Sequence, residues 1–358
     1  MRSITSPILA FILMLPVHGA AQSSGTIGHG TLIQTVDETA PHLVLDLSRP
    51  TPQSLSDRRP GANFLRLHLR LSGSQPLGPV SVDVSDGSGR LVQTVNLSGP
   101  ELPRDIWTKV IKGDVYIVRQ HGISPGPAQL AVSQVLVDVT LIEPEGFQKG
   151  GPFFTEIAAL SKNSPLRTVA LAVARMAVAR NDGGWSCTGF LIADRLLMTN
   201  HHCVASDDEC KATYVAFDAG FDPAPSNQIH CAAFRYGSPD LDFAVIELES
   251  SPGSAVPLKF SETPLSSPSA LQIVEHGWEY PEEISMTGCD VTATNVDSTI
   301  VDSHTDVSYT CDTFDSSSGS PVLTSDNRVV AIHHLQFPNR GVMIGDIVQE
   351  LNKEALSN

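Results

Sequence analysis

Three short segments, far apart in the sequence, contain a histidine pair, an aspartate and a run of serines. The segment "TNHHC" at 199–203 ends in His201, His202 and a cysteine. The segment "DLDFAVIEL" at 240–248 places Asp242 before an apolar run, and "DSSSGSPVL" at 315–323 places serines in a turn before a strand. A serine hydroxyl is nearly inert at neutral pH, so it needs a nearby base, which in turn needs a buried carboxylate to orient it. The order histidine, aspartate, serine therefore predicts an activated nucleophile, with backbone N–H groups near the serine binding the oxyanion.

The first residues of the chain have the pattern of an export signal. The chain has 358 residues, enough for two domains. Arg2 precedes the apolar run "ILAFILMLP", which is shorter than the ~18 residues of a spanning helix, and small residues precede Gln22. We expect residues 1–21 to be a signal peptide and the protein to be secreted, extracellular or periplasmic. A membrane anchor is the alternative for this segment, and we expect no membrane span elsewhere.

All six cysteines lie in the second half of the chain, and their even number indicates three disulfides in an exported protein. Pairing in sequence order is the simplest of the possible connectivities: Cys187–Cys203, Cys210–Cys231 and Cys289–Cys311. A zinc site in "HHCVASDDEC" at 201–210 is the alternative, but this spacing fits no compact zinc knuckle. We expect neither a metal nor a cofactor.

The negative charge is confined to one half of the chain. The whole net charge of −16 falls in residues 150–358, because residues 1–149 carry equal numbers of acidic and basic side chains. A surface of this sign repels nucleic acid and anionic membranes. We therefore expect no nucleic-acid partner, and the sequence leaves the oligomeric state open.

The hydrophobic pattern predicts two all-β domains. Residues 31–142 alternate with period two, as in "FLRLHLRLSG" at 64–73, where leucines form a buried face and Arg66, His68 and Arg70 a solvated one. This pattern predicts a β-sandwich, which we expect to be an accessory domain or a pro-domain. Residues 143–164 contain Pro and Gly and read as a linker. Beyond them come further short strands, beginning with "TVALAVARMAV" at 168–178, and only the tail "GDIVQELNKEAL" at 345–356 looks helical, with Asp346 placed to cap it.

Four motifs in residues 165–355 resemble those of the chymotrypsin-like serine peptidases, and are most similar to the glutamyl-endopeptidase-like bacterial branch. They are "SCTGFLI", "LLMTNHHC", "LDFAVIEL" and "CDTFDSSSGSPVL", in the order that this family has. The resemblance implies that residues 165–358 form a serine peptidase domain with a double β-barrel and a C-terminal helix. The implied activity is a serine endopeptidase acting on polypeptide substrates.

The resemblance also assigns roles to single residues. The base precedes the cysteine and is His202, Asp242 is the carboxylate, and the nucleophile is Ser318, which Gly, Ser and Pro follow. The backbone N–H groups of Ser316 and Ser318 would form the oxyanion hole. Because the family normally has Gly where this chain has Ser316, a catalytically silent homologue that acts as a binding protein is the alternative.

Three further positions correspond to the S1 pocket of the family, which binds the residue before the scissile bond. Asp312, six residues before Ser318, would select a basic residue. Thr313 and His333 occupy positions that grip a carboxylate in the glutamyl branch. The motifs favour an acidic residue, and a basic one remains the alternative.

Overall fold

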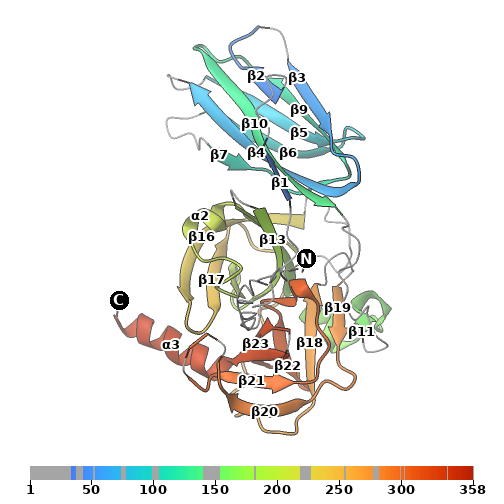
Figure 1. The fold of residues 1–358 in the computed structure, drawn as a ribbon, viewed down its shortest axis with the longest axis vertical. Coiled ribbons are helices and arrows are strands. Elements are labelled where there is room, and N and C mark those ends of the chain that lie inside the picture. Colours follow the sequence, from blue (N-terminus) through green and yellow to red (C-terminus); the bar gives the residue numbers. More distant parts are fainter. Residues whose placement is uncertain are drawn as a thin grey trace, which may run out of the picture.

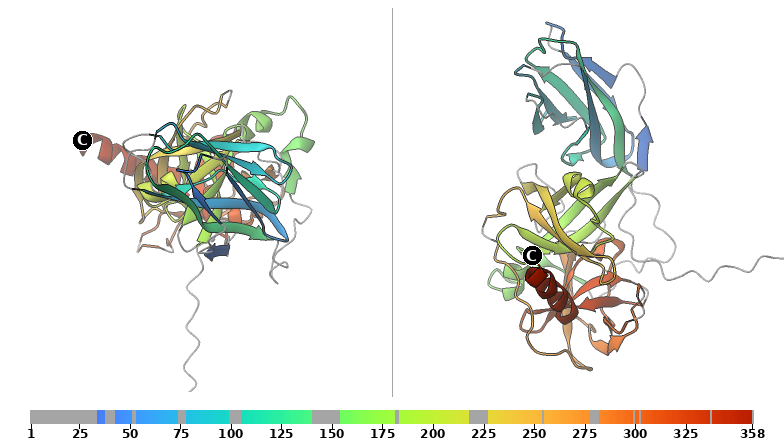
Figure 2. Two further views of the ribbon diagram at one scale, coloured as in Figure 1. Left: turned by 90° about the horizontal axis from the view of Figure 1, so that it is seen from above. Right: turned by 90° about the vertical axis from the view of Figure 1, so that its left-hand side faces the viewer.

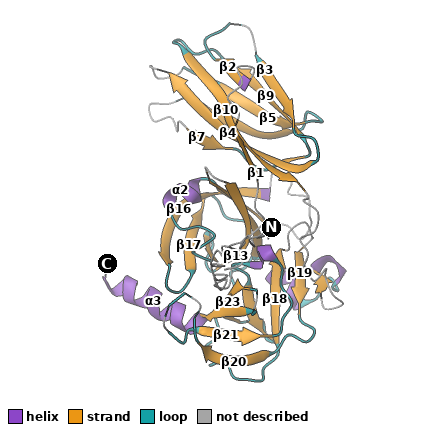
Figure 3. Ribbon diagram, viewed as in Figure 1, coloured by secondary structure: helices purple, strands orange, loops and turns teal. Residues whose placement is uncertain are grey.

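The structure is a computed structural model that describes residues 34–37, 43–50, 53–73, 78–98, 105–139, 154–180, 183–217, 227–253, 255–276, 282–298, 300–301, 303–336 and 338–357. These residues form two β-rich units stacked along the long axis, with few helices (Figures 1 and 3). The fold is therefore all-β, as expected. The predicted signal peptide and residues 143–153 of the predicted linker lie outside the described residues. Among the residues that are described, no helix has the length and apolar character needed to cross a membrane.

The first unit is a sandwich of two antiparallel sheets. One sheet contains β1 (Gln34–Asp37), β2 (Val44–Asp46), β4 (Ala62–Gly73), β7 (Asp105–Trp107), β8 (Ile111–Lys112) and β10 (Ala128–Val139). The other contains β3 (Ser54–Arg58), β5 (Ser81–Asp86), β6 (Leu91–Asn96) and β9 (Val115–His121). The alternating leucines of β4 enter the core between the sheets, as period-two patterning requires.

The outer face of β4 differs from the expectation of a solvated surface. Arg66 is 2% exposed because it packs against the second unit, and only Arg70 stays in solvent. His68 is 3% exposed and is covered within the sandwich, where it stacks on Trp107 at 4.6 Å and contacts Ser133. Arg66 uses its guanidinium as a bridge, donating to Thr108 O (2.8 Å) within the sandwich and to Ala177 O (2.9 Å) and Ala212 O (2.8 Å) across the interface.

A second polar pair joins the two units beside Arg66. The side-chain amide of Gln228 accepts from Val110 N (2.8 Å) and donates to Val110 O (3.1 Å). The phenol of Tyr214 accepts from Gln93 (3.2 Å) and lies under the Arg66 guanidinium at 5.4 Å. Buried and part-buried hydrogen bonds, rather than a flexible connection alone, hold the sandwich on the second unit (Figure 2).

The second unit begins with a closed six-stranded barrel. Its strands, in spatial order, are β12 (Val173–Arg180), β13 (Gly183–Leu191), β14 (Leu196–Thr199), β17 (Phe243–Leu248), β16 (Gln228–Ser238) and β15 (Thr213–Ala216). A short helix, α2 (Asp207–Lys211), begins at the N-cap Ser206, whose hydroxyl accepts from Glu209 N.

A second barrel follows in the chain. It is built from β18 (Leu271–His276), β20 (Val291–Val296), β21 (Asp306–Tyr309), β22 (Pro321–Thr324), β23 (Val329–Leu335) and β24 (Arg340–Met343). A bridge between Ala270 and Asp290 brings the first of these strands beside β20 and closes the ring. The helix α3 (Ile344–Ser357) follows it, and buried side chains of both barrels form one shared core. This is the double β-barrel that the sequence motifs imply.

Four local features differ from the sequence-based expectations. The strand expected from residue 168 starts only at Val173, because Pro165 begins a helix, α1 (Pro165–Ala170), and proline is well suited to the first helical turn. Helices α1 and α2 also show that the tail is not the only helical segment.

Within the predicted linker, β11 (Phe154–Glu156) pairs with β19 (Glu282–Ser285), so these residues extend the sheet of the second barrel. Asp346 lies inside the first turn of α3 rather than before it.

The structure forms three disulfides, and each joins neighbouring cysteines in sequence order. Cys187–Cys203 connects β13 to the turn that carries His202. Cys210–Cys231 ties α2 to β16, and Cys289–Cys311 links the residues before β20 to those after β21. No described cysteine is free.

Candidate active site

His202 and Asp242 meet at one end of the first barrel. His202 lies in the turn after β14, and Asp242 lies in the turn between β16 and β17. His202 Nδ1 is 2.8 Å from Asp242 Oδ2, and the backbone N–H of His202 donates to Asp242 Oδ1 at 2.9 Å. Because a carboxylate only accepts, Nδ1 carries the proton, and Nε2 of the neutral ring is left as a base.

The backbone around Asp242 is held in an uncommon shape. Its φ of 43° is in the left-handed region, which aspartate tolerates better than most residues. Asn200 supports the turn by donating its side-chain amide to Asp242 O at 2.8 Å. Burial alone would raise the pKa of Asp242, but His202 and a second imidazole, His334, lower it well below the usual range. Asp242 is therefore an anion at neutral pH.

Ser318 lies in a turn that both barrels hold. The turn consists of a short 3-10 helix, η4 (Asp315–Ser317), followed by Ser318 and by Gly319 at φ +89°. Thr188 of the first barrel donates its N–H to Ser318 O (2.8 Å) and its hydroxyl to Ser316 O (3.0 Å). From the second barrel, His333 O accepts the N–H of Gly319 at 2.9 Å.

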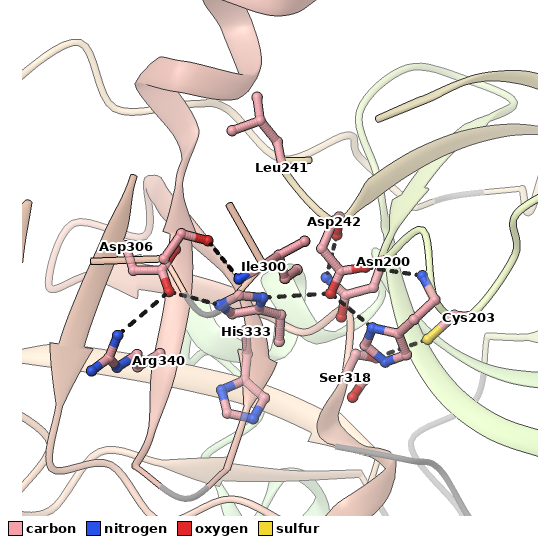
Figure 4. A network of polar contacts seen from close by, with 12 residues as sticks. Asn200, Cys203, Leu241, Asp242, Ile300, Asp306, Ser318, His333 and Arg340 are labelled. Atoms are coloured by element: carbon pink, nitrogen blue, oxygen red, sulfur yellow. Dashed lines mark hydrogen bonds and ion pairs between the residues drawn. The ribbon is translucent and has the colours of Figure 1, made fainter. Parts of the chain in front are cut away.

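The structure thus brings the histidine, aspartate and serine segments into one site. The carbonyl oxygen of Ser318 lies 4.0 Å from Cys203 Sγ, directly after His202 in the chain (Figure 4). The side chain of Ser318 is almost completely buried, and the buried Nε2 of His202 makes no hydrogen bond to the described residues. In the absence of substrate, catalytic hydrogen bonds are often long or poorly aligned.

The serines of the turn have different partners. The N–H of Ser317 donates to Phe314 O (3.0 Å), so it is not available to an oxyanion. The hydroxyl of Ser316 donates to His276 O at 2.7 Å, which fixes the residue that replaces the family's glycine. The hydroxyl of Ser317 donates to Glu275, a fully buried acid at the end of β18.

Glu275 is a feature of the site that sequence reasoning missed. Burial, and to a smaller extent the neighbouring Glu283 and Asp312, raise the pKa of Glu275 well above its usual range, which favours its neutral form. Glu275 supports the turn by accepting the hydrogen bond of the Ser317 hydroxyl. The signal that could have identified it is the adjacent pair Glu275–His276 at the end of an apolar strand.

The three residues assigned to the S1 pocket lie on and around the second barrel. Thr313 donates its hydroxyl to Asn339 Oδ1 (2.9 Å), and the backbone N–H of Asp312 donates to Ser285 Oγ (3.1 Å). His333 is buried, with Nδ1 2.6 Å from the Tyr309 hydroxyl. Burial, together with the nearby His334 and His202, lowers the pKa of His333 to about 3, so its ring is neutral.

A hollow of about 340 Å³ borders His202 on the first barrel. Arg180 lies on one wall, paired with Glu209 at 2.7 Å and stacked over the Trp185 ring at 5.2 Å. Within the described residues, the one cluster with metal-ligand side chains combines His202 with Cys187 and Cys203. The two sulfurs are bonded to each other, so they offer no thiolate to a metal.

A comparison with protein families matches residues 187–332 to the model described as a trypsin-like peptidase domain. Residues 187–332 are therefore similar to a trypsin-like peptidase domain. The match includes the segments of His202, Asp242 and Ser318 and extends to β23 of the second barrel.

The chain also has distant similarities to individual proteins. "Secreted RxLR effector protein 73" of Plasmopara viticola is 29% identical over 199 residues, which cover 50% of this chain and 49% of that protein, so the chain spans about half the length of this relative. Among solved structures, a Glu endopeptidase in complex with MPD is 19% identical, with a TM-score of 0.45 over 58% of this chain and 99% of that one. The active form of the Rv3671c protease of M. tuberculosis is 16% identical, with a TM-score of 0.43 over 60% and 93%.

Proposed function

We propose that the chain is a secreted serine endopeptidase that hydrolyses polypeptides through an acyl-enzyme intermediate. The observation that carries the proposal is the 2.8 Å contact between His202 Nδ1 and the buried carboxylate of Asp242, beside the turn of Ser318. An imidazole oriented in this way is a general base for a hydroxyl in reach of Nε2. The triad needs no metal or cofactor to perform this chemistry.

In the proposed mechanism, Ser318 Oγ attacks the carbonyl carbon of the scissile peptide while His202 Nε2 takes its proton. The imidazolium that forms is stabilised by Asp242, and it then gives the proton to the leaving amine. Water repeats the sequence on the acyl-enzyme and releases the second product. The site supplies orientation and a buried anion before substrate arrives, so neither has to be organised during the reaction.

The oxyanion is assigned to the backbone N–H groups of Ser316 and Ser318. Thr188 donates hydrogen bonds to the carbonyl groups of these two residues, which supports this assignment. The bonds fix the peptide planes before and after the one that carries the N–H of Ser318. Donors that are held in place before the reaction are worth more than donors that must reorient.

For the residue before the scissile bond we propose an acidic side chain, received by the Thr313 hydroxyl and the His333 ring. Because His333 is neutral, it would act as a hydrogen-bonding group rather than as a cation. Asp312 favours the opposite preference, for lysine or arginine. Cleavage of a peptide library decides between the two preferences. Enrichment of Glu or Asp before the scissile bond supports the proposal, and enrichment of Lys or Arg would mean that Asp312 determines the selectivity.

For the sandwich we propose an accessory domain that stays attached to the peptidase domain, rather than a propeptide that departs. The hydrogen bonds of Arg66 and Gln228 across the interface support this proposal. Three disulfides and the name of the effector relative favour export. N-terminal sequencing of exported material tests both statements, because an accessory domain predicts a mature start near Gln22, whereas a departing propeptide predicts a start between Glu143 and Thr168.

A serine-directed fluorophosphonate probe tests the activity itself. We expect covalent labelling of the wild type and none of Ser318→Ala, with Ser317→Ala as a matched control that keeps the nucleophile. If the folded wild type is not labelled, the alternative function applies, and the protein is a catalytically silent homologue that binds a partner. If Ser318→Ala is still labelled, the nucleophile is another serine.

A further inference from the structure

A second histidine lies behind Asp242, on the side away from His202. His334 belongs to β23, and its side chain has no exposed surface. Its Nδ1 is 3.4 Å from Asp242 Oδ2, the same oxygen that His202 contacts, and its Nε2 is 3.2 Å from Asp306 Oδ2. Figure 4 shows this line of polar contacts running from Arg340 through Asp306 to Asp242.

The surroundings of this ring favour its protonated form. A neutral imidazole has one N–H and presents a lone pair at its other nitrogen, whereas a carboxylate can only accept. Nε2 makes a hydrogen bond to Asp306, and Nδ1 lies at ion-pair distance from Asp242 without a hydrogen bond to the described residues, so the imidazolium is the form that suits both carboxylates. Burial alone would lower the pKa of His334, but Asp242 and Asp306 raise it to about 9, which agrees with a protonated ring at neutral pH.

The contacts also connect the two barrels. Asp242 and His202 come from the first barrel, whereas His334, Asp306 and Arg340 come from the second, which also carries Ser318. A charged pair across the boundary therefore holds the carboxylate in place relative to the nucleophile. Asp306 is itself fully buried and lies 4.0 Å from Arg340, so the buried charges alternate in sign.

We propose that His334 is a positioning residue of the active site: as an imidazolium between Asp242 and Asp306, it holds Asp242 against His202. The inference rests on the proposed peptidase function. The charged or titratable groups around His334 are Asp242, Asp306, His202, His333 and, beyond Asp306, Arg340.

The first test compares rates of fluorophosphonate labelling, and of peptide cleavage once a substrate is found, from pH 4 to pH 10. For His334→Gln we expect a loss of about ten- to a hundredfold in kcat with little change in KM, because the substrate does not touch His334. We also expect the acidic limb of the profile to move, because the cation beside Asp242 is removed. His68→Gln, which alters an equally buried histidine of the sandwich, is the control and should keep the wild-type profile.

The second test does not depend on activity. In protein with ¹⁵N-labelled histidine, the ring of His334 should carry protons on both nitrogens at pH 7 and release one only near pH 9. Asp306→Asn should lower the pH of this release, since one of the two carboxylates is gone. This measurement applies even if His334→Gln does not fold.

The outcomes separate the two claims. An unlabelled wild type removes the peptidase function, while the NMR titration still reports on the ring. A labelled wild type whose profile coincides with that of folded His334→Gln overturns the positioning role alone. A neutral His334 ring at pH 7 overturns it as well.

Discussion

The glycine after Ser318 gives the sharpest test of how the nucleophile is held. Gly319 has φ +89°, and a Cβ built on it would lie 2.0 Å from Thr188 O and 2.5 Å from the Thr199 hydroxyl. Ordinary contact begins near 3.4 Å, so a methyl group would have to separate the turn from β13 by about 1.4 Å. Thr188 O belongs to the backbone of a barrel strand and cannot rotate away.

We therefore expect Gly319→Ala to displace Ser318 from His202. Misplacement of a reacting group by ~1 Å costs on the order of a hundredfold in rate, which corresponds to about 2.7 kcal/mol of activation free energy. The assay is the second-order rate of fluorophosphonate labelling at pH 8, together with the thermal midpoint of the same sample. The left-handed φ adds a stability cost of about 1–2 kcal/mol.

Gly253→Ala separates the contact from the backbone conformation. Gly253 has a similar φ of +82° in the same domain, but nothing lies within 4 Å of a Cβ there. This control should lose about 1–2 kcal/mol of stability and keep the wild-type labelling rate. Labelling of folded Gly319→Ala within threefold of the wild type would refute the reasoning, because the turn would then tolerate separation from Thr188.

Three further predictions follow from buried polar groups. Asp242→Asn replaces the acceptor for Nδ1–H of His202 with a neutral amide, and we expect kcat to fall about 10⁴-fold at neutral pH; a loss below tenfold would show that another group orients the base. Arg66→Met removes the guanidinium that donates to Ala177 O and Ala212 O across the interface, so urea unfolding should show a loss of about 3 kcal/mol, against less than 1 kcal/mol for the exposed Arg70→Met; equal losses would contradict a role of the interface. The fold raises the pKa of Glu275. Its contribution to stability is therefore complete at a pH below the pKa of this group in the unfolded chain, and it disappears as the pH rises through the pKa in the folded protein. Thermal midpoints should therefore fall less between pH 5 and pH 8 for Glu275→Gln than for the wild type, and an identical fall would mean that Glu275 is ionised throughout.

The sequence predicted those parts of the molecule that depend on local pattern. The alternating leucines of β4 predicted a sandwich strand, and cysteines in sequence order predicted the disulfides that form. The segments of His202, Asp242 and Ser318 were recognisable because each is a short turn of polar residues beside an apolar strand. Turn chemistry and period-two patterning act over a few residues, so a single sequence contains them.

The rest depends on contacts between distant segments. Arg66 and His68 were assigned to a solvated face because alternation distinguishes two faces of a strand but not what covers the outer one. Helix α1 was missed because six residues are too few for a helical period to appear. His334 stood beside His333 in an apolar strand, and its partner Asp306 lies 28 residues away on another strand, so nothing local indicated the pairing.

Thr188 has a consequence for anyone who recombines proteins of this kind. It belongs to one barrel, yet its N–H and hydroxyl fix the main chain of a turn that the other barrel provides, and its carbonyl takes the Thr199 hydroxyl at 2.8 Å. The two halves are therefore not interchangeable modules. In a chimera that takes one barrel from a relative, the nucleophile will be positioned correctly only if the strand that carries Thr188 and the turn that carries Ser318 come from the same protein.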